Sequence, residues 1–237
     1  VFDLDHTLIA CDATILWTEF LYEKKIVTDP IWRQYDRDMV KSYAKGVLDI
    51  RDFCRKHSGA FRSIPEEKLH ALAQEFAKKK IAPLIFPDGK KWAKNALQAN
   101  IPACVLSASA AFIVKPIAKL FGLTDAMGIE LAFKDGFCTG EIVGIPTFQE
   151  GKVERLSERL AEAGIGFEDV LFFTDSRNDL PLAERAGYTV CVNPDAVLES
   201  AARKNGWKVA EWKLSLRTQM TAQVDAKGVP ETQTVRS

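Results

Sequence analysis

The sequence predicts an α/β fold in three layers, with a central parallel sheet covered by helices on both faces. From Pro87 onwards, short and almost wholly apolar segments alternate with segments of helical periodicity. Such apolar segments are typical of buried parallel strands, because helices cover both sides of their sheet. Residues 12–86 interrupt the alternation with a helical stretch rich in Trp, Tyr, Lys and Arg. The sequence therefore indicates an α/β core with an inserted helical unit.

The elements of the predicted core follow one another in a regular order. The chain opens on a strand and a turn over residues 1–9. A hairpin with strands over 129–133 and 137–143 is indicated by Lys134-Asp135-Gly136, since Asp-Gly favours a tight turn. The other predicted elements are helices over 88–100, 112–121, 152–163, 180–186 and 196–205, and strands over 103–106, 170–173 and 189–192.

The helical insert and the C-terminal tail differ from this pattern. In the insert, one helix begins near Ile64-Pro65-Glu66-Glu67 and ends at Lys78-Lys79-Lys80. Positive side chains at the C-terminal end of a helix interact favourably with its dipole. Its apolar face carries Leu69, Leu72, Ala73 and Phe76. The tail is polar and free of aromatic residues, which is typical of a weakly packed arm. We expect a core over 1–11 and 87–214, a helical cap over 12–86 and a C-terminal arm over 215–237.

The composition excludes several classes of protein. The 237 residues carry no net formal charge, so we expect no nucleic-acid partner, and no apolar run approaches the roughly 20 residues of a membrane-spanning helix. The five cysteines are scattered and odd in number, which favours reduced thiols and a cytoplasmic protein. Because the chain begins without Met in an apparent strand, we expect a few residues before Val1. The oligomeric state is not indicated.

Polar side chains follow three of the predicted strands. Asp3 and Asp5 come after the first strand, Ser107 after the second and Asp175 after the third. The carboxyl ends of parallel strands meet at one edge of a sheet, where ligands bind. Two carboxylates so close in sequence need a counter-charge, and Mg²⁺ prefers such hard oxygen ligands. The sequence therefore predicts a Mg²⁺ site at this edge.

Four ordered motifs resemble those of the haloacid dehalogenase (HAD) superfamily. They are Asp3-x-Asp5-x-Thr7, Val105-Leu106-Ser107, Lys152, and Thr174-Asp175-Ser176-Arg177-Asn178-Asp179. The insert after the first motif resembles the cap of the phosphoserine-phosphatase-like subfamily IB. The segment Phe148-Gln149-Glu150-Gly151-Lys152 is similar to a bacterial branch of phosphoserine and histidinol-phosphate phosphatases. The resemblance covers roughly residues 1–212 and implies a Rossmann-like HAD core.

The resemblance implies a role for each motif residue. Asp3 is the nucleophile that forms an aspartyl-phosphate, and Asp5 is the general acid and base. Mg²⁺ is held by Asp3, by Asp175 and by the backbone carbonyl of Asp5. Lys152, Ser107 and the backbone N–H groups of Leu4 and Ala108 bind the phosphate. Asp179 orients a water ligand of the metal, and Asn178 either supports the metal's ligands or caps a helix.

Departures from the family pattern bear on the substrate. Thr174 stands where the family has Gly, which we expect to be tolerated at a strand end. Ala108 and Ser109 replace two Gly of phosphoserine phosphatases, which weakens the case for phosphoserine. Asp12 corresponds to a Glu that holds the substrate ammonium in those enzymes. Its shorter carboxylate could hold a different amine or cap a helix.

The sequence therefore predicts a Mg²⁺-dependent phosphatase of a small phosphomonoester, histidinol phosphate or a phosphoserine-like compound of amino-acid biosynthesis. Two alternatives stay open, a phosphotransferase to an acceptor hydroxyl and a catalytically idle phosphate-binding protein. We expect His6 to point away from the site, and His57 and His70 to lie on the surface. The cap arginines that could contact a substrate carboxylate are Arg33, Arg37, Arg51, Arg55 and Arg62.

Overall fold

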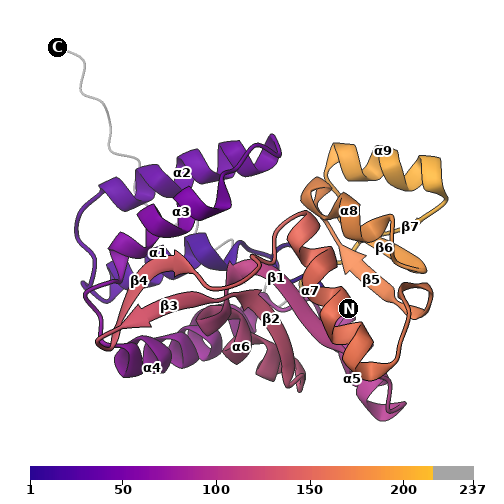
Figure 1. Cartoon of the computed structure of the whole chain (residues 1–237), viewed down its shortest axis with the longest axis horizontal. Helices are drawn as coiled ribbons and strands as arrows, with labels where there is room; N and C mark the ends of the chain where they lie inside the picture. Colours follow the sequence, from indigo (N-terminus) through magenta and orange to yellow (C-terminus); the bar gives the residue numbers. More distant parts are fainter. Residues whose placement is uncertain (216–237) are drawn as a thin grey trace.

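The computed structural model describes residues 1–215 and has a parallel sheet between two layers of helices (Figure 1). Every pairing in this sheet is parallel, as expected of strands joined by helices. The predicted α/β fold class is therefore confirmed. In spatial order, the sheet joins β2 (Asp125–Ile129), β1 (Cys104–Ala110), residues 1–3, β5 (Leu171–Thr174), β6 (Tyr188–Val192) and β7 (Lys208–Ala210).

The first residues of the chain lie at the centre of the sheet. The backbone N–H of Phe2 donates to Cys104 O, and that of Asp3 donates to Phe173 O, both at 2.9 Å. This segment therefore lies between β1 and β5. The chain then turns at His6, whose φ of 55° is in the left-handed region. The predicted strand and turn over residues 1–9 are thus a very short strand followed by a loop.

Two hydrophobic clusters hold helices on the two faces of the sheet. Phe173 packs in one cluster with apolar residues of α5 and α6, whereas its neighbour Phe172 packs in the other with residues of α7 and α8. Successive side chains of a strand point to opposite faces, so β5 contributes to both clusters. The core helices are α5 (Pro87–Gln98), α6 (Ala111–Ala118), α7 (Glu150–Ala163), α8 (Leu180–Ala183) and α9 (Ala196–Asn205).

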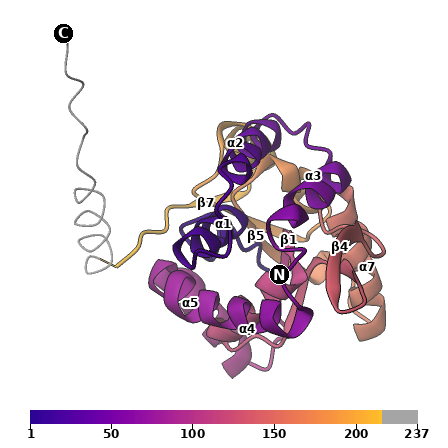
Figure 2. The ribbon, with the colours of Figure 1, turned by 90° about the vertical axis from the view of Figure 1, so that its left-hand side faces the viewer.

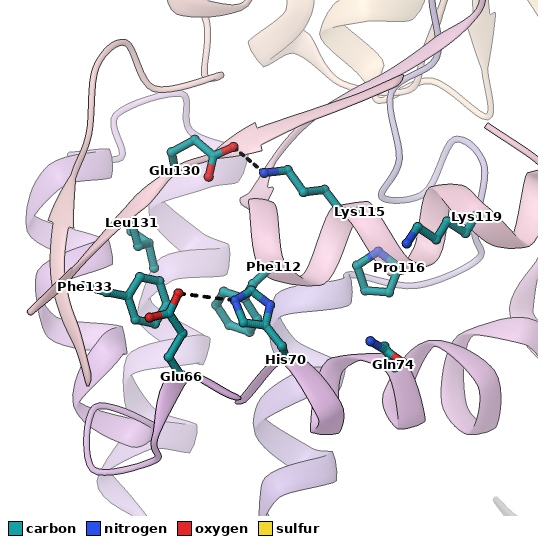
Figure 3. Close-up of a pocket in the computed structure, with 10 residues that line it drawn as sticks. All are labelled: Glu66, His70, Gln74, Phe112, Lys115, Pro116, Lys119, Glu130, Leu131 and Phe133. Carbon is teal, nitrogen blue, oxygen red and sulfur yellow. Dashed lines mark hydrogen bonds and ion pairs between the residues drawn. The ribbon is translucent and has the colours of Figure 1, made fainter. Parts of the chain in front are cut away.

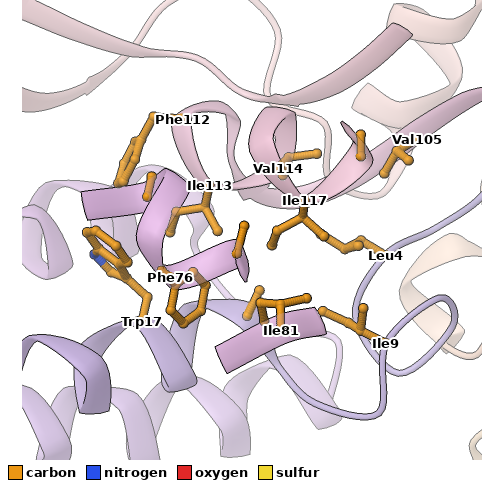
Figure 4. Close-up of a cluster of buried hydrophobic side chains, with 14 of the residues drawn as sticks. Leu4, Ile9, Trp17, Phe76, Ile81, Val105, Phe112, Ile113, Val114 and Ile117 are labelled. Atoms are coloured by element: carbon orange, nitrogen blue, oxygen red, sulfur yellow. The ribbon is translucent and has the colours of Figure 1, made fainter. Parts of the chain in front are cut away.

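The insert is helical, and part of it shares the core of the α/β unit. Phe76 and Ile81 pack in one cluster with Ile113 and Ile117 of α6 (Figure 4). Trp17 lies edge-on to Phe76, with 5.4 Å between ring centroids. The insert contains α1 (Ala13–Glu23), α2 (Ile31–Ala44), α3 (Ile50–His57), α4 (Glu66–Phe76) and a π-helical turn (Ala77–Ile81).

The predicted hairpin is formed by β3 (Leu131–Lys134) and β4 (Phe137–Ile142), with Asp135-Gly136 at its tip. It lies beside α3 of the insert and outside the parallel sheet (Figure 1). The prediction that its first strand begins at Ile129 is wrong, because Ile129 pairs with Ala110 as part of β2. The apolar residues of β2 and β3 are nearly continuous in sequence, so periodicity alone does not separate the two strands.

Two further features of the sheet differ from the prediction. Strand β1 extends to Ala110, so Ser107 and Ser109 lie inside it and not beyond its end. β7 was not predicted, since it is a short and largely exposed edge strand without a periodic signal. Short 3₁₀ turns cover Ser58–Ala60, Ala82–Leu84, Lys119–Phe121, Phe167–Asp169 and Arg177–Asp179.

His57 is buried, and its predicted surface position is wrong. Its Nε2 lies 3.0 Å from Thr18 Oγ1 and 3.3 Å from Asp36 Oδ1. The charged neighbours of His57 in sequence point elsewhere, while the face of α3 that carries it packs against α1 and α2. His70 is exposed, as predicted.

The five cysteines are free thiols, in agreement with the predicted reduced state. Among the helices of residues 1–215, none has the length and apolar character needed to cross a bilayer. Figure 2 gives a second view of the described part. From residue 216 onwards, the predicted arm over 215–237 lies outside the described residues.

Candidate active site

The motif residues meet at the carboxyl edge of the sheet. Asp3 ends the central segment, Ser107 and Ser109 lie near the end of β1, and Asp175 follows β5. Lys152, in the first turn of α7, reaches this edge with its ammonium group. The structure therefore gathers side chains from four distant parts of the chain.

Lys152 is buried between two carboxylates. Its Nζ lies 2.7 Å from Asp3 Oδ1 and 2.7 Å from Asp179 Oδ1, with 1 % of its side chain exposed. Burial opposes the charge of Lys152, but Asp179 and Asp3 raise its pKa above the ordinary value. Thr174 Oγ1 donates to Asp179 Oδ2 at 2.7 Å. Thr174, which departs from the family pattern, therefore orients Asp179, the partner of Lys152.

Asp5 is held by three donors on the other side of this edge. Its Oδ2 accepts hydrogen bonds from Ser109 Oγ (2.9 Å) and Ser107 Oγ (3.1 Å), and its Oδ1 accepts one from the Ala13 N–H (2.6 Å). Burial and the nearby charge of Asp12 raise the pKa of Asp5 to about 6. A carboxyl group with this pKa can give and take a proton near neutral pH.

Asp3 is buried and Asp175 is half-buried, and the charge of Asp3 acts on Asp175. Burial raises the pKa of Asp3 to about 7, against the attraction of Lys152. Burial, followed by the charges of Asp3 and Asp179, holds the pKa of Asp175 well above its ordinary value. Thr7 Oγ1 donates to Asp175 Oδ1 at 3.0 Å. Burial is the main cause of both raised pKa values, and repulsion among the acids of this edge adds to it.

The chemistry of these acids fits a divalent cation. Within residues 1–215 no cluster of three or more His, Cys, Asp or Glu side chains is arranged to hold a metal. The predicted site is of another kind, because it has two carboxylates, those of Asp3 and Asp175, and the backbone carbonyl of Asp5. A Mg²⁺ ion there would complete its shell with phosphate and water oxygens. A cation would also favour the charged forms of both acids.

The remaining predicted residues lie around these groups. Leu4 is fully buried next to Asp3, and Ala108 lines the cavity above the site. The Asn178 amide donates from Nδ2 to the backbone carbonyl of Tyr43 at 3.0 Å. This contact joins the loop after β5 to α2, whereas the sequence predicts that Asn178 supports the metal's ligands.

A cavity of about 200 Å³ opens above the motif residues, between the sheet edge and the insert. Asp12 lines it and caps α1, since its Oδ1 accepts a hydrogen bond from the Ile15 N–H at 3.0 Å. The cavity wall is largely apolar where α2 and α3 approach, through Met39 and Phe53 among others. None of the described residues that line this cavity is Arg or Lys.

The arginines of the insert point elsewhere. Arg33 forms two hydrogen bonds of 2.7 Å with Glu19, and Arg55 lies 3.0 Å from Glu141. None of the five arginines named as candidate carboxylate contacts lines the cavity described here. His6, which we expect to point away from the site, is exposed and lies beside this cavity.

A second hollow, of about 410 Å³, lies between α4, α6 and β3 (Figure 3). Two ion pairs line it, His70 with Glu66 (3.7 Å) and Lys115 with Glu130 (2.7 Å). It contains none of the motif residues. The candidate active site is therefore the smaller cavity at the sheet edge.

Three polar contacts were not predicted from sequence. Ser109 and Thr7 hold the two acids Asp5 and Asp175, and Thr174 holds Asp179. Each of these hydroxyl residues lies within or beside a motif. The sequence shows where these hydroxyl residues stand relative to the motifs. It does not show which acid each one donates to, because that depends on the order of the strands in the sheet.

Comparisons with known proteins agree with this geometry. The sequence pattern of the haloacid dehalogenase-like hydrolases matches residues 1–184. A histidinol-phosphatase of Neisseria meningitidis serogroup C (strain 8013) is 35 % identical over 217 residues, which cover 90 % of this chain and 98 % of that protein. A phosphoserine phosphatase of Mycobacterium tuberculosis (strain ATCC 25618 / H37Rv) is 27 % identical over 219 residues, which cover 90 % of this chain and 70 % of that protein.

Solved structures are similar as well. A protein of unknown function from Bordetella pertussis Tohama I has a TM-score of 0.79 and 31 % identity, over 88 % of this chain and 95 % of that chain. A phosphoserine phosphatase with an analogue of its phospho-aspartyl intermediate has a TM-score of 0.65 and 22 % identity, over 93 % of this chain and 96 % of that chain, and is similar in fold alone. The resemblance inferred from the four motifs is confirmed: the chain belongs to the haloacid dehalogenase-like hydrolase family, among its phosphatases.

Proposed function

We propose that the chain hydrolyses a small phosphomonoester by way of an aspartyl-phosphate on Asp3. The observation that carries this proposal is the buried contact of 2.7 Å between Asp3 and Lys152, at a sheet edge that also holds Asp5. A nucleophile needs a free oxygen and charge neutralisation of its target. The ammonium group of Lys152 touches Asp3 Oδ1 and is placed to bind a phosphoryl oxygen as well.

The two acids divide the chemistry between them. An Asp3 oxygen attacks phosphorus, the bond between phosphorus and the ester oxygen breaks, and Asp5 gives its proton to the leaving alkoxide. Asp5 then takes a proton from water, whose oxygen attacks phosphorus, and inorganic phosphate leaves Asp3. The pKa of about 6 for Asp5 suits both steps near neutral pH. When bound to Asp3, Asp175 and the Asp5 carbonyl, Mg²⁺ would supply further charge neutralisation of the phosphate.

The other residues of the site orient these groups. Ser107 and Ser109 fix the Asp5 carboxylate. When substrate binds, the single hydroxyl proton of Ser107 would turn from Asp5 to a phosphoryl oxygen. The backbone N–H groups of Leu4 and Ala108 are proposed donors to the same phosphate. Asp179 keeps Lys152 in place.

Histidinol phosphate fits the cavity better than phosphoserine. Both esters carry an amine, which the carboxylate of Asp12 would bind. Phosphoserine also carries a carboxylate, and the described residues that line the cavity include no Arg or Lys to receive it. The apolar wall near Met39 and Phe53 suits a ring-bearing leaving group. We therefore infer an amino-alcohol phosphate without a carboxylate, and a cytoplasmic role in amino-acid biosynthesis.

Steady-state kinetics on a panel of phosphate esters with Mg²⁺ test this choice. We expect kcat/KM for histidinol phosphate to exceed that for phosphoserine by about 100-fold, because an unpaired carboxylate among acids is strongly unfavourable. Val40→Arg would place a cation at the cavity wall and should narrow this ratio, whereas Val209→Arg, at an exposed position on β7, should not. A preference for phosphoserine in the unmodified protein would contradict the choice of substrate. Transfer to an added alcohol in place of phosphate release would instead identify a phosphotransferase.

Metal dependence gives a second prediction. We expect activity to disappear with EDTA and to return with Mg²⁺. Because the pKa of Asp3 is about 7, protons compete with Mg²⁺ for this carboxylate below neutral pH. Mg²⁺ affinity, measured by calorimetry, should therefore weaken by about tenfold per pH unit as the pH falls from 7 to 5.5. An affinity that does not change over this range, or activity that survives chelation, would contradict the proposed site.

A further inference from the structure

Two side-chain amides of the core bind the C-terminal end of α2. Asn178 Nδ2 donates to Tyr43 O at 3.0 Å, and Gln149 Nε2 donates to Gly46 O at 3.3 Å. The two amides are also joined, because Gln149 Nε2 donates to Asn178 Oδ1 at 3.1 Å. Carbonyl groups at the end of a helix lack the full set of partners found within it, so they are natural acceptors.

Two further contacts lie at the same place. The rings of Tyr43 and Phe148 are 5.8 Å apart. Gly46 has a φ of +71°, and a Cβ atom added there would lie 3.3 Å from Arg177 Nε. The end of α2 therefore fits closely against both the loop before α7 and the loop after β5.

The two amides come from the two segments that also carry the buried ion pair of Lys152 and Asp179. Gln149 lies immediately before α7, three residues from Lys152, and Asn178 is the neighbour of Asp179. Lys152 and Asp179 form the buried ion pair. Gln149 also has φ +49° and ψ −122°, a conformation that non-glycine residues rarely adopt and that surrounding contacts must maintain.

We propose that Gln149 and Asn178 form a latch that fastens α2 over the substrate cavity. Met39 and Tyr43 of α2 line this cavity, so release of the helix end would open it on that side. The latch residues are positioning residues, which act through α2 and not on the reacting atoms. The inference rests on the proposed function, because the cavity is taken to hold the substrate.

Hydrogen exchange on the full chain tests the latch without relying on activity. Gln149→Met keeps the side-chain length but removes both hydrogen bonds. We expect the backbone amides over 43–47 to exchange about tenfold faster in this variant, as the loss of two hydrogen bonds predicts. Gln98→Met, at an exposed position on α5, is the matched control and should exchange like the unmodified protein. Unchanged exchange over 43–47 in Gln149→Met would overturn the latch.

Gly46→Ala tests the same contact from the side of the insert. The new Cβ would press on Arg177, so exchange over 43–47 should again rise, and this variant serves if Gln149→Met does not fold. In kinetics with histidinol phosphate, Gln149→Met should raise KM about tenfold and leave kcat within about threefold. A fall in kcat with an unchanged KM would overturn the latch. If the unmodified protein hydrolyses no ester, the proposed function fails, while the exchange experiment still decides the latch.

Discussion

Asp3→Asn is expected to reduce phosphate release by about four orders of magnitude, as loss of an essential nucleophile does in other enzymes. The amide of Asn has nearly the shape of the carboxylate but cannot form the acyl phosphate. In the unmodified protein, hydroxylamine or borohydride can trap the aspartyl-phosphate, because both attack the acyl carbon of this mixed anhydride. Stopped assays of phosphate release, followed over hours, measure the residual rate.

The matched control for this variant is Asp135→Asn at the exposed tip of the hairpin, which should keep full activity. Asp5→Asn should behave differently from both, since it leaves the nucleophile intact but removes the proton carrier. We expect it to slow turnover while labelling of Asp3 remains detectable. If Asp3→Asn retained more than about one per cent of the rate, an aspartyl-phosphate on this residue would be ruled out.

Lys152→Met should lower the free energy of unfolding by about 3–5 kcal/mol, because it leaves two buried carboxylates without their cation. Methionine keeps much of the volume of the lysine stem, so the loss reflects charge more than packing. Asp3 and Asp179 are the two groups left unpaired, and their side chains are 8 % and 1 % exposed. Lys90→Met, at an exposed position on α5, should change stability little.

The pH dependence of the stability loss in Lys152→Met shows whether charge or packing causes it. Burial already raises the pKa of Asp3 to about 7, and removal of the ammonium group should raise it further. A raised pKa in the folded state means that stability is present at low pH and is lost as the pH rises through that value. In urea unfolding without metal, the difference in unfolding free energy between Lys152→Met and the unmodified protein should therefore be larger at pH 8 than at pH 5. An equal loss at both pH values would point to packing in place of charge.

Much of the candidate site followed from the sequence, because each acid sits at the end of an apolar strand. A general property of parallel sheets predicts that Asp3 and Asp175 lie at the same sheet edge. That their two strands are neighbours is seen only in the structure. The burial of Lys152 between Asp3 and Asp179 agrees with the motif order. The positions of these acids depend on the local pattern of apolar strands followed by polar residues. They depend also on the connection rules of parallel sheets, which leave few possible topologies.

Other features depend on which surfaces meet, and sequence pattern does not carry that information. His57 has charged neighbours in sequence but a buried side chain, since helix packing decides which face is covered. The sequence predicts that Ser107 faces the phosphate from beyond a strand that ends at residue 106. In the structure β1 continues to Ala110, four residues further, and Ser107 Oγ donates to Asp5. The contact of Gln149 with Gly46 joins residues 103 positions apart.

The central place of residues 1–3 in the sheet makes the site depend on segments far along the chain. Asp3 meets its ammonium partner 149 positions later, and the strand that flanks it on one side begins only at Leu171. A nascent chain that stops before β5 lacks strands β5, β6 and β7 of the sheet. It also lacks Asp175 and Asp179, which follow β5. Such long-range pairing slows folding and exposes apolar strands meanwhile. An incomplete chain therefore lacks part of the proposed site until β5 and the loop after it have been synthesised.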